Sequence, residues 1–342
     1  MTTYSYFPGC SANSTGISYT KSADFVCKKI GIELEEIPEW CCCGTSAAKL
    51  TSYDLGYALP SRSLALAEKL DASRPIVAPC AGCYAALKDA LVYAQASKEN
   101  LEHVRDMINM PYEASVQVMN LLEVFSTQEA KDALQQQITK PLSAFKVACY
   151  YGCALVRPVE VCKFDDPEDP QSMDTIMRLA GAEPIDWSFK TECCGAAQQM
   201  AVPKPSRVLI ERIFQNAEAN GANAIVTACP LCWMNLDMRV KAINKERAEA
   251  GKPAFDLPVF FFTELLGVAL GGDAKTLGID VHFQPGAPAF IDQKVKESAQ
   301  IEEERKLAAA EEARKLEERA AKLAAKKQAK AEDVHSPQGG EQ

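Results

Sequence analysis

Ten of the fourteen cysteines in this chain fall into two copies of one ordered pattern. Each copy has a lone Gly-Cys, then a Cys-Cys-Gly, then a Cys-x-x-Cys. The first copy holds Cys10, Cys42, Cys43, Cys80 and Cys83, and the second holds Cys153, Cys193, Cys194, Cys229 and Cys232. A single Cys-x-x-Cys is weak evidence for a site. Three cysteine groups in the same order, twice, predict two equivalent sites built from thiols.

Three kinds of chemistry suit these thiols. Thiolates are the usual ligands of iron–sulfur clusters, and five cysteines per copy is one more than a four-iron cubane needs. Structural zinc takes four ligands, so the Cys-Cys pair and the Cys-x-x-Cys would satisfy it and leave Cys10 or Cys153 unused. Dithiol redox chemistry of the thioredoxin kind uses a Cys-x-x-Cys that follows a strand and opens a helix. The pattern favours iron–sulfur ligation and leaves the other two interpretations, and inert buried thiols, open.

The bulk composition narrows the class of protein. A length of 342 residues suggests about two domains, in agreement with the duplication. The net charge of −9 argues against a general nucleic-acid or anionic-membrane surface. The first residues lack the basic and apolar segments of a secretory signal, and no apolar run is long enough to span a membrane. We therefore expect a soluble cytoplasmic protein, in which reduced thiols point to metal rather than to disulfides.

Strand-like segments precede the motif cysteines in both copies. They lie at residues 3–7, 32–37 and 75–78 in the first copy and at 145–148, 182–187 and 224–227 in the second. Helical patterns follow at 59–69, 84–95, 206–218 and 233–245. Such alternation predicts an α/β fold with two duplicated domains, each a mostly parallel sheet flanked by helices. Sites in such sheets lie beyond the carboxyl ends of the strands, so each sheet should bring its three cysteine groups to one crevice.

The expected domain boundaries follow from these patterns. A first Cys-Cys-Gly domain would span residues 1–97, a helical spacer 98–143, a second Cys-Cys-Gly domain 144–290, and a charged helical tail 291–342. Pairs such as Glu302–Lys306, four residues apart, support a helix in the tail. Its end, from residue 336, is expected to be disordered. A solvated single helix and a partner-docking helix are both open interpretations of the tail.

Four cysteines stand outside the pattern. Cys27 and Cys162 are expected to be buried, as is Cys149, although Cys149 could approach the second site. Cys41 extends the first pair to three consecutive cysteines, so it is either a spare thiol or an alternative ligand.

Candidate proton donors are few. His282 and Lys190 are considered, together with Glu192 beside the second Cys-Cys pair. Lys190 could instead anchor an anionic substrate group. His103 in the spacer and His335 in the tail are expected to face solvent. A flavin or nicotinamide fingerprint, Gly-x-Gly-x-x-Gly after a strand, is missing from the sequence, so we expect neither cofactor on this chain.

Several stretches resemble the B subunit of heterodisulfide reductase, which belongs to the Cys-Cys-Gly domain family. They are Tyr6-Phe7-Pro8-Gly9-Cys10-Ser11, Ala78-Pro79-Cys80-Ala81-Gly82-Cys83-Tyr84, Ala148-Cys149-Tyr150-Tyr151-Gly152-Cys153, Asp165-Asp166-Pro167, Lys190-Thr191-Glu192-Cys193-Cys194-Gly195 and Ala228-Cys229-Pro230-Leu231-Cys232. The resemblance covers about residues 3–285 and leaves the tail outside. The family usually has a different residue at the position of Cys41. The acidic pair Asp165-Asp166 has a charge that suggests no nucleophile or metal role.

The resemblance implies that each set of five cysteines holds one noncubane [4Fe-4S] cluster. It implies the catalytic subunit of a heterodisulfide-reductase-like complex, an oxidoreductase that cleaves a small-molecule disulfide, or forms it in reverse, with two electrons. We expect the two clusters to share one substrate cavity, with Cys10 and Cys153 as catalytic ligands. Expected partners in the complex are a small ferredoxin-like protein with cubane clusters and a flavin-containing protein.

Two alternatives to this function remain. One is an iron–sulfur electron-transfer subunit of a succinate- or fumarate–quinone complex. The other is a zinc-stabilised scaffold protein.

Overall fold

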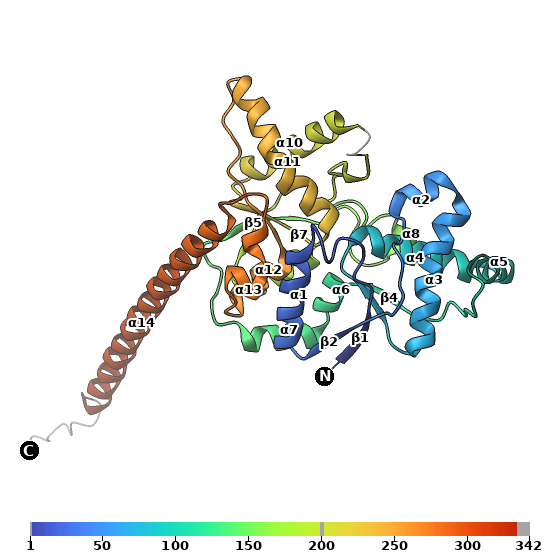
Figure 1. Ribbon diagram of the computed structural model, residues 1–342. Coiled ribbons are helices and arrows are strands. Elements are labelled where there is room, and N and C mark those ends of the chain that lie inside the picture. Colours follow the sequence, from blue (N-terminus) through green and yellow to red (C-terminus); the bar gives the residue numbers. More distant parts are fainter. Residues whose placement is uncertain (1, 199–201, 334–342) are drawn as a thin grey trace, which may run out of the picture.

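The duplication is visible as two four-stranded parallel sheets in a computed structural model that describes residues 2–198 and 202–333 (Figure 1). The first sheet has β1 (Thr2–Tyr6), β2 (Ile32–Glu36), β3 (Ile76–Ala78) and β4 (Val118–Asn120) in the order β2-β1-β3-β4. The second has β5 (Lys146–Tyr150), β6 (Glu183–Pro184), β7 (Ala224–Thr227) and β8 (Val259–Phe261) in the order β6-β5-β7-β8. The two orders are the same when counted within each half, so the α/β fold with two duplicated domains is confirmed.

Helices connect the strands and flank the sheets. In the first half they are α1 (Ile17–Lys29), α2 (Thr45–Thr51), α3 (Tyr53–Asp71), α4 (Ala81–Ala96), α5 (Lys98–Ile108), α6 (Leu121–Phe125) and α7 (Gln128–Gln137). In the second half they are α8 (Val159–Cys162), α9 (Ser172–Leu179), α10 (Pro203–Ala219), α11 (Pro230–Glu249), α12 (Phe262–Ala269), α13 (Ala274–Leu277) and α14 (Ala287–Asp333), with short 3₁₀ turns η1 (Ala196–Gln198) and η2 (Ile279–Val281). The parallel strands require these crossovers, because strands that run the same way cannot be joined by a tight turn.

Two expectations about secondary structure are wrong. The spacer at residues 98–143 is not helical throughout, because Val118–Asn120 forms β4, the edge strand paired with β3. The predicted strand at 182–187 is only the two residues of β6. Pro184 lacks an amide hydrogen and cannot continue the ladder as a donor, which fits a short edge strand.

The two halves pack through an aromatic and polar contact between α1 and the β8–α12 junction. The ring of Tyr19 stacks on that of Phe261 with a centroid distance of 4.2 Å and an interplanar angle of 3°. The Tyr19 hydroxyl donates to the carbonyl of Ala228 at 3.3 Å, and the Ser22 and Thr263 hydroxyls lie 2.7 Å apart. Both halves thus contribute to one buried core rather than to two separate ones.

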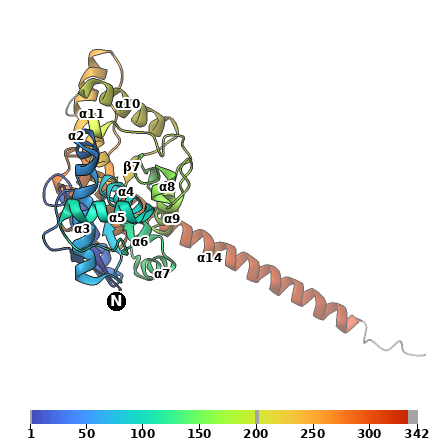
Figure 2. The ribbon, with the colours of Figure 1, turned by 90° about the vertical axis from the view of Figure 1, so that its right-hand side faces the viewer.

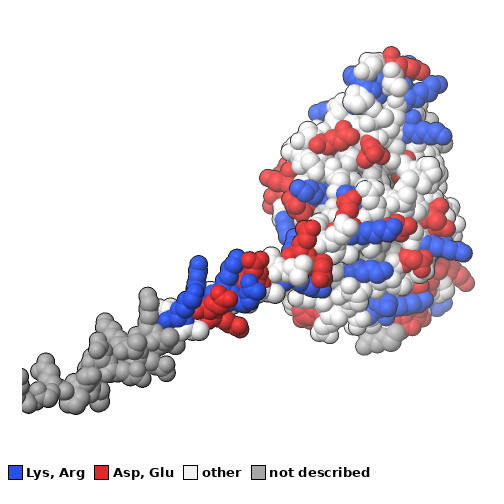
Figure 3. All heavy atoms as spheres, turned by 90° about the vertical axis from the view of Figure 1, so that its left-hand side faces the viewer, with Lys and Arg blue, Asp and Glu red and all other residues white. Residues whose placement is uncertain are grey.

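Helix α14 leaves the body and extends away from it (Figures 1 and 2). Its first turns are anchored: Ile291 is buried, and the Ser298 hydroxyl accepts a hydrogen bond from the amide of Ala144 at 3.0 Å. Beyond Glu303 the described side chains are exposed, and charges of both signs follow one another along the helix (Figure 3). The predicted charged helix is therefore present, and the expected disordered end and His335 lie outside the described residues.

Candidate functional site: two cysteine sets and a shared cavity

The first cysteine set lies at the carboxyl ends of three neighbouring strands. Cys10 follows β1, Cys42 and Cys43 follow β2, and Cys80 follows β3 as the N-cap of α4. Cys83 lies in the first turn of α4, and its Sγ is 3.3 Å from that of Cys43. Cys43, Cys80 and Cys83 are buried, whereas Cys10 and Cys42 are exposed. The expectation that one sheet brings three cysteine groups together thus agrees with this half.

The second set repeats the arrangement. Cys153 follows β5, Cys193 and Cys194 follow β6, and Cys229 is the N-cap of α11 with Cys232 in its first turn. In both halves a Cys-x-x-Cys therefore opens a helix directly after a buried strand. The positive end of the helix dipole favours the thiolate there, which is the form of cysteine that binds metals.

Hydrogen bonds between thiols leave one member of each contact easy to ionise. The thiol of Cys83 lowers the pKa of Cys43 to about 6, and that of Cys153 lowers the pKa of Cys193 to about 6. Hydrogen bonds from Cys232 lower the pKa of Cys194 and, together with Cys80, hold the pKa of Cys229 well below its usual value. Each set therefore contains thiols that are ready to act as ligands at neutral pH.

One glycine in each half makes room for these sulfurs. Gly9 and Gly152 precede Cys10 and Cys153 and have φ angles of +75° and +68°. A Cβ atom on either residue would lie 3.0 Å from a sulfur of the same set, that of Cys83 or Cys232. Glycine is required both for the left-handed backbone and for the close approach to the thiols.

The Cys-x-x-Cys turns of the two sets lie side by side: a Cβ atom on Gly82 would lie 3.7 Å from Cys80 Sγ and 3.3 Å from Leu231 Cδ1. Interaction between the thiols of Cys80 and Cys229 raises the pKa of Cys80 and contributes to the lowered pKa of Cys229. Both residues are N-caps of the equivalent helices α4 and α11. The two sites are therefore adjacent inside the protein.

A cavity of about 410 Å³ opens between the halves. All five cysteines of the second set line it: Cys153, Cys193, Cys194, Cys229 and Cys232. The opposite wall comes from α2, α3 and α4 of the first half, and most of the other lining residues are small and apolar, such as Ala81, Gly82, Ala85, Ala196 and Leu231. A volume of this order suits a small organic molecule. A cavity lies between the halves, as expected, but the expectation that both cysteine sets face it is wrong: only thiols of the second set are on its wall, and Cys10 is not among the lining residues.

Three charged residues of the cavity are not predicted from the sequence. Lys49 and Asp89 form an ion pair on the first-half wall, and Arg157 lies on the second-half wall, where its amide donates to the carbonyl of Cys153 at 3.1 Å. The Arg157 guanidinium binds Glu168 at 2.8 Å and the Thr191 hydroxyl at 3.2 Å. Nothing in the local sequence marks Lys49 or Asp89, because only the packing of the two halves places them beside the second cysteine set.

The candidate proton donors lie elsewhere. Lys190 is buried against Asp169 and Asp174, and His282 is buried against Glu264 with an Nε2–Oε1 distance of 2.8 Å; neither lines the cavity. Burial opposes protonation of His282, but the charge and hydrogen bond of Glu264 outweigh it and raise the pKa of the imidazole. His103, exposed and paired with Asp54, does not line the cavity either.

The remaining candidate residues do not line the cavity. Glu192 is exposed beside Cys193 and is not among the lining residues. Cys27, Cys149 and Cys162 are buried, as expected. The Cys41 thiol donates to the carbonyl of Leu59 on α3 at 3.4 Å, so in this structure it is bonded to α3.

The donor chemistry fits a multi-iron cluster in each half, since each set offers five thiols and a glycine that opens space beside them. Within residues 2–198 and 202–333, no group of three or more His, Cys, Asp or Glu side chains converges on a point where a single metal ion would sit.

Comparisons with known proteins agree with this architecture. Residues 4–88 and 147–237 each match the cysteine-rich domain family known as CCG. The membrane anchor subunit of 8-methylmenaquinol:fumarate reductase from Wolinella succinogenes is 30% identical over 278 residues, 81% of this chain and 95% of that protein. The B subunit of the ferredoxin/F420H2-dependent CoB-CoM heterodisulfide reductase from Methanosarcina acetivorans is 28% identical over 287 residues, 82% of this chain and 93% of that protein.

A protein from Archaeoglobus profundus, named as similar to the B subunit of heterodisulfide reductase, is 27% identical over 290 residues, which are 82% of this chain and 95% of that protein. A solved structure of a hypothetical protein from Helicobacter pylori shares the fold, with a TM-score of 0.65 and 15% identity over 82% of this chain. The chain spans about half, 51%, of that protein. The resemblance to the B subunit of heterodisulfide reductase is thereby confirmed. No helix in the described part of the chain is long and apolar enough to cross a membrane.

Proposed function

We propose that this chain, which belongs to the cysteine-rich (CCG) domain family, is the catalytic subunit of a heterodisulfide-reductase-like complex. Relatives named as subunits of heterodisulfide reductase and of a fumarate reductase support an iron–sulfur subunit of an oxidoreductase complex. The finer proposal is that this chain reduces a small-molecule disulfide, or forms one in reverse.

The observation that carries the proposal is the cavity between the halves. One wall holds the five thiols of the second set, and the Cys-x-x-Cys turn of the first set adjoins that of the second through the close approach of Gly82 to Leu231. A disulfide in this cavity would reach the second site, while Cys43, Cys80 and Cys83 of the first set lie within the same buried core. Two electrons and two protons are needed to convert one disulfide into two thiols.

Each cysteine set is proposed to hold one [4Fe-4S] cluster, of the noncubane kind that the family resemblance implies, and such clusters supply electrons one at a time. The ligands would be Cys10, Cys42, Cys43, Cys80 and Cys83 in the first half, and Cys153, Cys193, Cys194, Cys229 and Cys232 in the second. The small apolar side chains of the cavity would exclude water from the disulfide. Arg157 and Lys49 are the cations at its wall that could orient a polar or anionic end of the substrate.

Electrons would come from partner proteins, for which a ferredoxin-like protein and a flavin-containing protein of the same complex are the candidates. Relatives named as subunits of larger complexes support such an assembly. The assembly and its cytoplasmic location remain predictions.

A second function has a specific observation in its favour. The relative at 30% identity is named as the membrane anchor subunit of a fumarate reductase. Under this alternative the chain passes electrons between a quinol-side partner and a flavoprotein, and a disulfide is not its substrate. The zinc-stabilised scaffold is a third candidate. Purified protein that contains zinc and no acid-labile sulfide would identify it.

Disulfide turnover by the oxygen-free full-length protein, with a reduced viologen dye as donor, separates these functions. We expect Cys10→Ala and Cys153→Ala each to abolish turnover, because both clusters are needed for a two-electron step. Cys27→Ala is the matched control, since Cys27 is a buried cysteine of α1 outside both sets. If each loss merely halves the rate, the sites act independently. Absence of any thiol product from a panel of disulfides would favour the fumarate–quinone alternative.

A further inference from the structure

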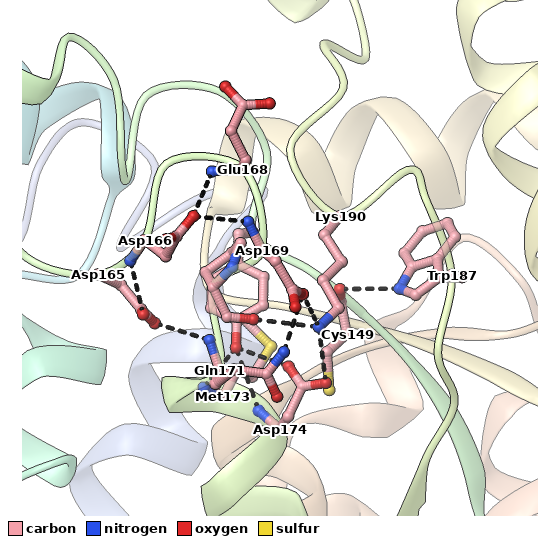
Figure 4. A network of polar contacts seen from close by, with 12 residues as sticks. Cys149, Asp165, Asp166, Glu168, Asp169, Gln171, Met173, Asp174, Trp187 and Lys190 are labelled. Atoms are coloured by element: carbon pink, nitrogen blue, oxygen red, sulfur yellow. Dashed lines mark hydrogen bonds and ion pairs between the residues drawn. The ribbon is translucent and has the colours of Figure 1, made fainter.

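The Cys-Cys-Gly loop of the second half begins with a buried lysine. Only 4% of the Lys190 side chain is exposed. Its ammonium lies 2.7 Å from Asp169 Oδ1 and 3.2 Å from Asp174 Oδ1, and it also donates to the carbonyl of Pro170 at 3.2 Å (Figure 4). Burial opposes the charge of Lys190, but its contacts with Asp169 and Asp174 together outweigh this effect and raise its pKa. The lysine is thus held by the acidic segment between α8 and α9, residues 165–171, and by Asp174 in the first turn of α9.

The backbone of the same residue holds a second segment. The carbonyl of Lys190 accepts hydrogen bonds from the amides of Tyr151 at 2.9 Å and Gly152 at 3.1 Å. These two residues directly precede Cys153. One residue therefore connects the loop of Cys153, the loop of Cys193 and Cys194, and the acidic segment.

The hydroxyls of two tyrosines add further hydrogen bonds between these loops and the residues that hold Lys190. The Tyr151 hydroxyl donates to Asp174 Oδ2 at 2.7 Å and accepts from the amide of Met173 at 2.7 Å. The Tyr150 hydroxyl donates to the carbonyl of Glu192 at 2.6 Å, next to Cys193. Asp174 is almost fully buried, so its charge is satisfied by Lys190 and Tyr151 rather than by water.

The Asp165-Asp166 motif has a structural role: its two carboxylates fix the fold of the acidic segment. Asp165 Oδ2 accepts from the amides of Gln171 and Ser172 at 3.1 and 2.8 Å. Asp166 Oδ1 accepts from the amides of Glu168 and Asp169 at 2.8 and 2.9 Å (Figure 4). These turns fold the segment back on itself and present Asp169 and Asp174 to the lysine.

The first half has no equivalent of this arrangement at the matching positions. When the two Cys-Cys-Gly motifs are aligned, Glu39 stands where the second half has Lys190, and its side chain is 80% exposed. When the two Gly-Cys motifs are aligned, Pro8 stands where the second half has Tyr151. The connection is therefore confined to the half whose thiols line the cavity.

We propose that Lys190 is a positioning residue for the second cysteine set: it fixes the loop of Cys153 to the loop of Cys193 and Cys194. Its relevance to a cluster rests on the proposed function. A buried ion pair is costly to desolvate and seldom adds net stability over apolar residues, but removal of one partner leaves the other charge buried without compensation. Such a pair is suited to holding loops in a single arrangement.

Lys190→Met and Lys190→Arg in the full-length chain test the proposal, with Lys146→Met as matched control, because Lys146 is an exposed lysine of β5 in the same half. The first readout is the EPR spectrum of the oxygen-free protein. We expect Lys190→Met to shift or lose the signal that disappears in Cys153→Ala, and to keep the signal that disappears in Cys10→Ala. Lys190→Arg should restore the lost signal, since a guanidinium can also pair with the two aspartates.

The second readout needs no cluster. After iron is removed with a chelator, alkylation of single thiols is followed by mass spectrometry. Lys190→Met should accelerate the reaction of Cys153 and Cys193 several-fold, with Cys10 and Cys42 of the first half as unchanged internal references. If Lys190→Met does not fold, Asp169→Asn, which alters only the exposed partner, should give a smaller acceleration at the same two thiols.

Two results would overturn the proposal. One is a spectrum and alkylation rates in Lys190→Met equal to those of wild type. The other is equal acceleration at all four thiols without rescue by arginine, which would mean a general loosening of the fold. A wild-type chain without iron and sulfide would refute the proposed function instead, and the alkylation result would still decide whether Lys190 positions the two loops.

Discussion

At the scale of single residues, the buried charges of this molecule come in partnered groups. Lys190 lies between Asp169 and Asp174, and His282 lies against Glu264 in the second half. Glu264 uses its other carboxylate oxygen to accept from the amide of Phe261 at 2.8 Å, at the start of α12. The His282 pair thus fastens the segment after η2 to the helix that follows the last strand.

The raised pKa of His282 predicts a pH dependence of stability. A group that binds its proton more tightly in the folded state stabilises the protein fully below its unfolded pKa, near 6.5. That contribution is lost as the pH rises through the higher, folded pKa. We therefore expect the free energy of unfolding to fall more steeply with rising pH above 6.5 in wild type than in His282→Gln.

Urea unfolding under reducing conditions at a series of pH values measures this difference. The comparison with His282→Gln cancels the titration of the many thiols, which both proteins share. Parallel curves for the two proteins would show that His282 does not carry the effect. Asp237 and Asp280 also face the imidazole, so variants of these residues check that Glu264 is the main partner.

At the scale of elements, both halves place their cysteines by the same device: a short buried strand, a glycine turn and a helix start. The sequence predicts this well, because β1, β3, β5 and β7 are strand-forming runs directly before the motifs. Three-residue strands such as β4 and β8 run straight into helices α6 and α12, so their pattern could not be separated from the helical one. The sequence does not predict that Lys49 and Asp89 line the cavity, because only the packing of the two halves places them beside the second cysteine set.

A glycine pair tests whether the turn before Cys153 is shaped by the thiols. Gly152 and Gly221 have similar left-handed φ angles of +68° and +81°, but a Cβ atom would meet Cys232 Sγ at 3.0 Å at the first and nothing within 4 Å at the second. Gly221→Ala should lower the free energy of unfolding by about 1–2 kcal/mol, the cost of the left-handed backbone. Gly152→Ala should lower it further and also reduce the iron content.

Chemical denaturation and iron analysis of the two variants, each compared with wild type, provide the measurement. Equal losses of stability in both variants, with iron unchanged in Gly152→Ala, would mean that the contact with Cys232 imposes no constraint.

At the scale of the whole molecule, the duplication places one cavity between the two halves. The halves share a core through Tyr19 and Phe261, and the cavity lies where they meet. The equivalence that the sequence suggests is broken by packing, because the second cysteine set lines the cavity and the first set lies behind it with Cys10 and Cys42 exposed. Under the proposed function, one cavity beside two adjacent cysteine sets is an arrangement that suits a two-electron reaction.

The most direct test of the central claim is the metal content of the full-length protein purified without oxygen, with EPR spectra on the same sample before and after a disulfide is added. We expect roughly eight irons and eight acid-labile sulfides per chain, as two four-iron clusters require, and a signal that changes with the disulfide. Zinc without sulfide would contradict it and would leave the cysteines as a scaffold for the fold.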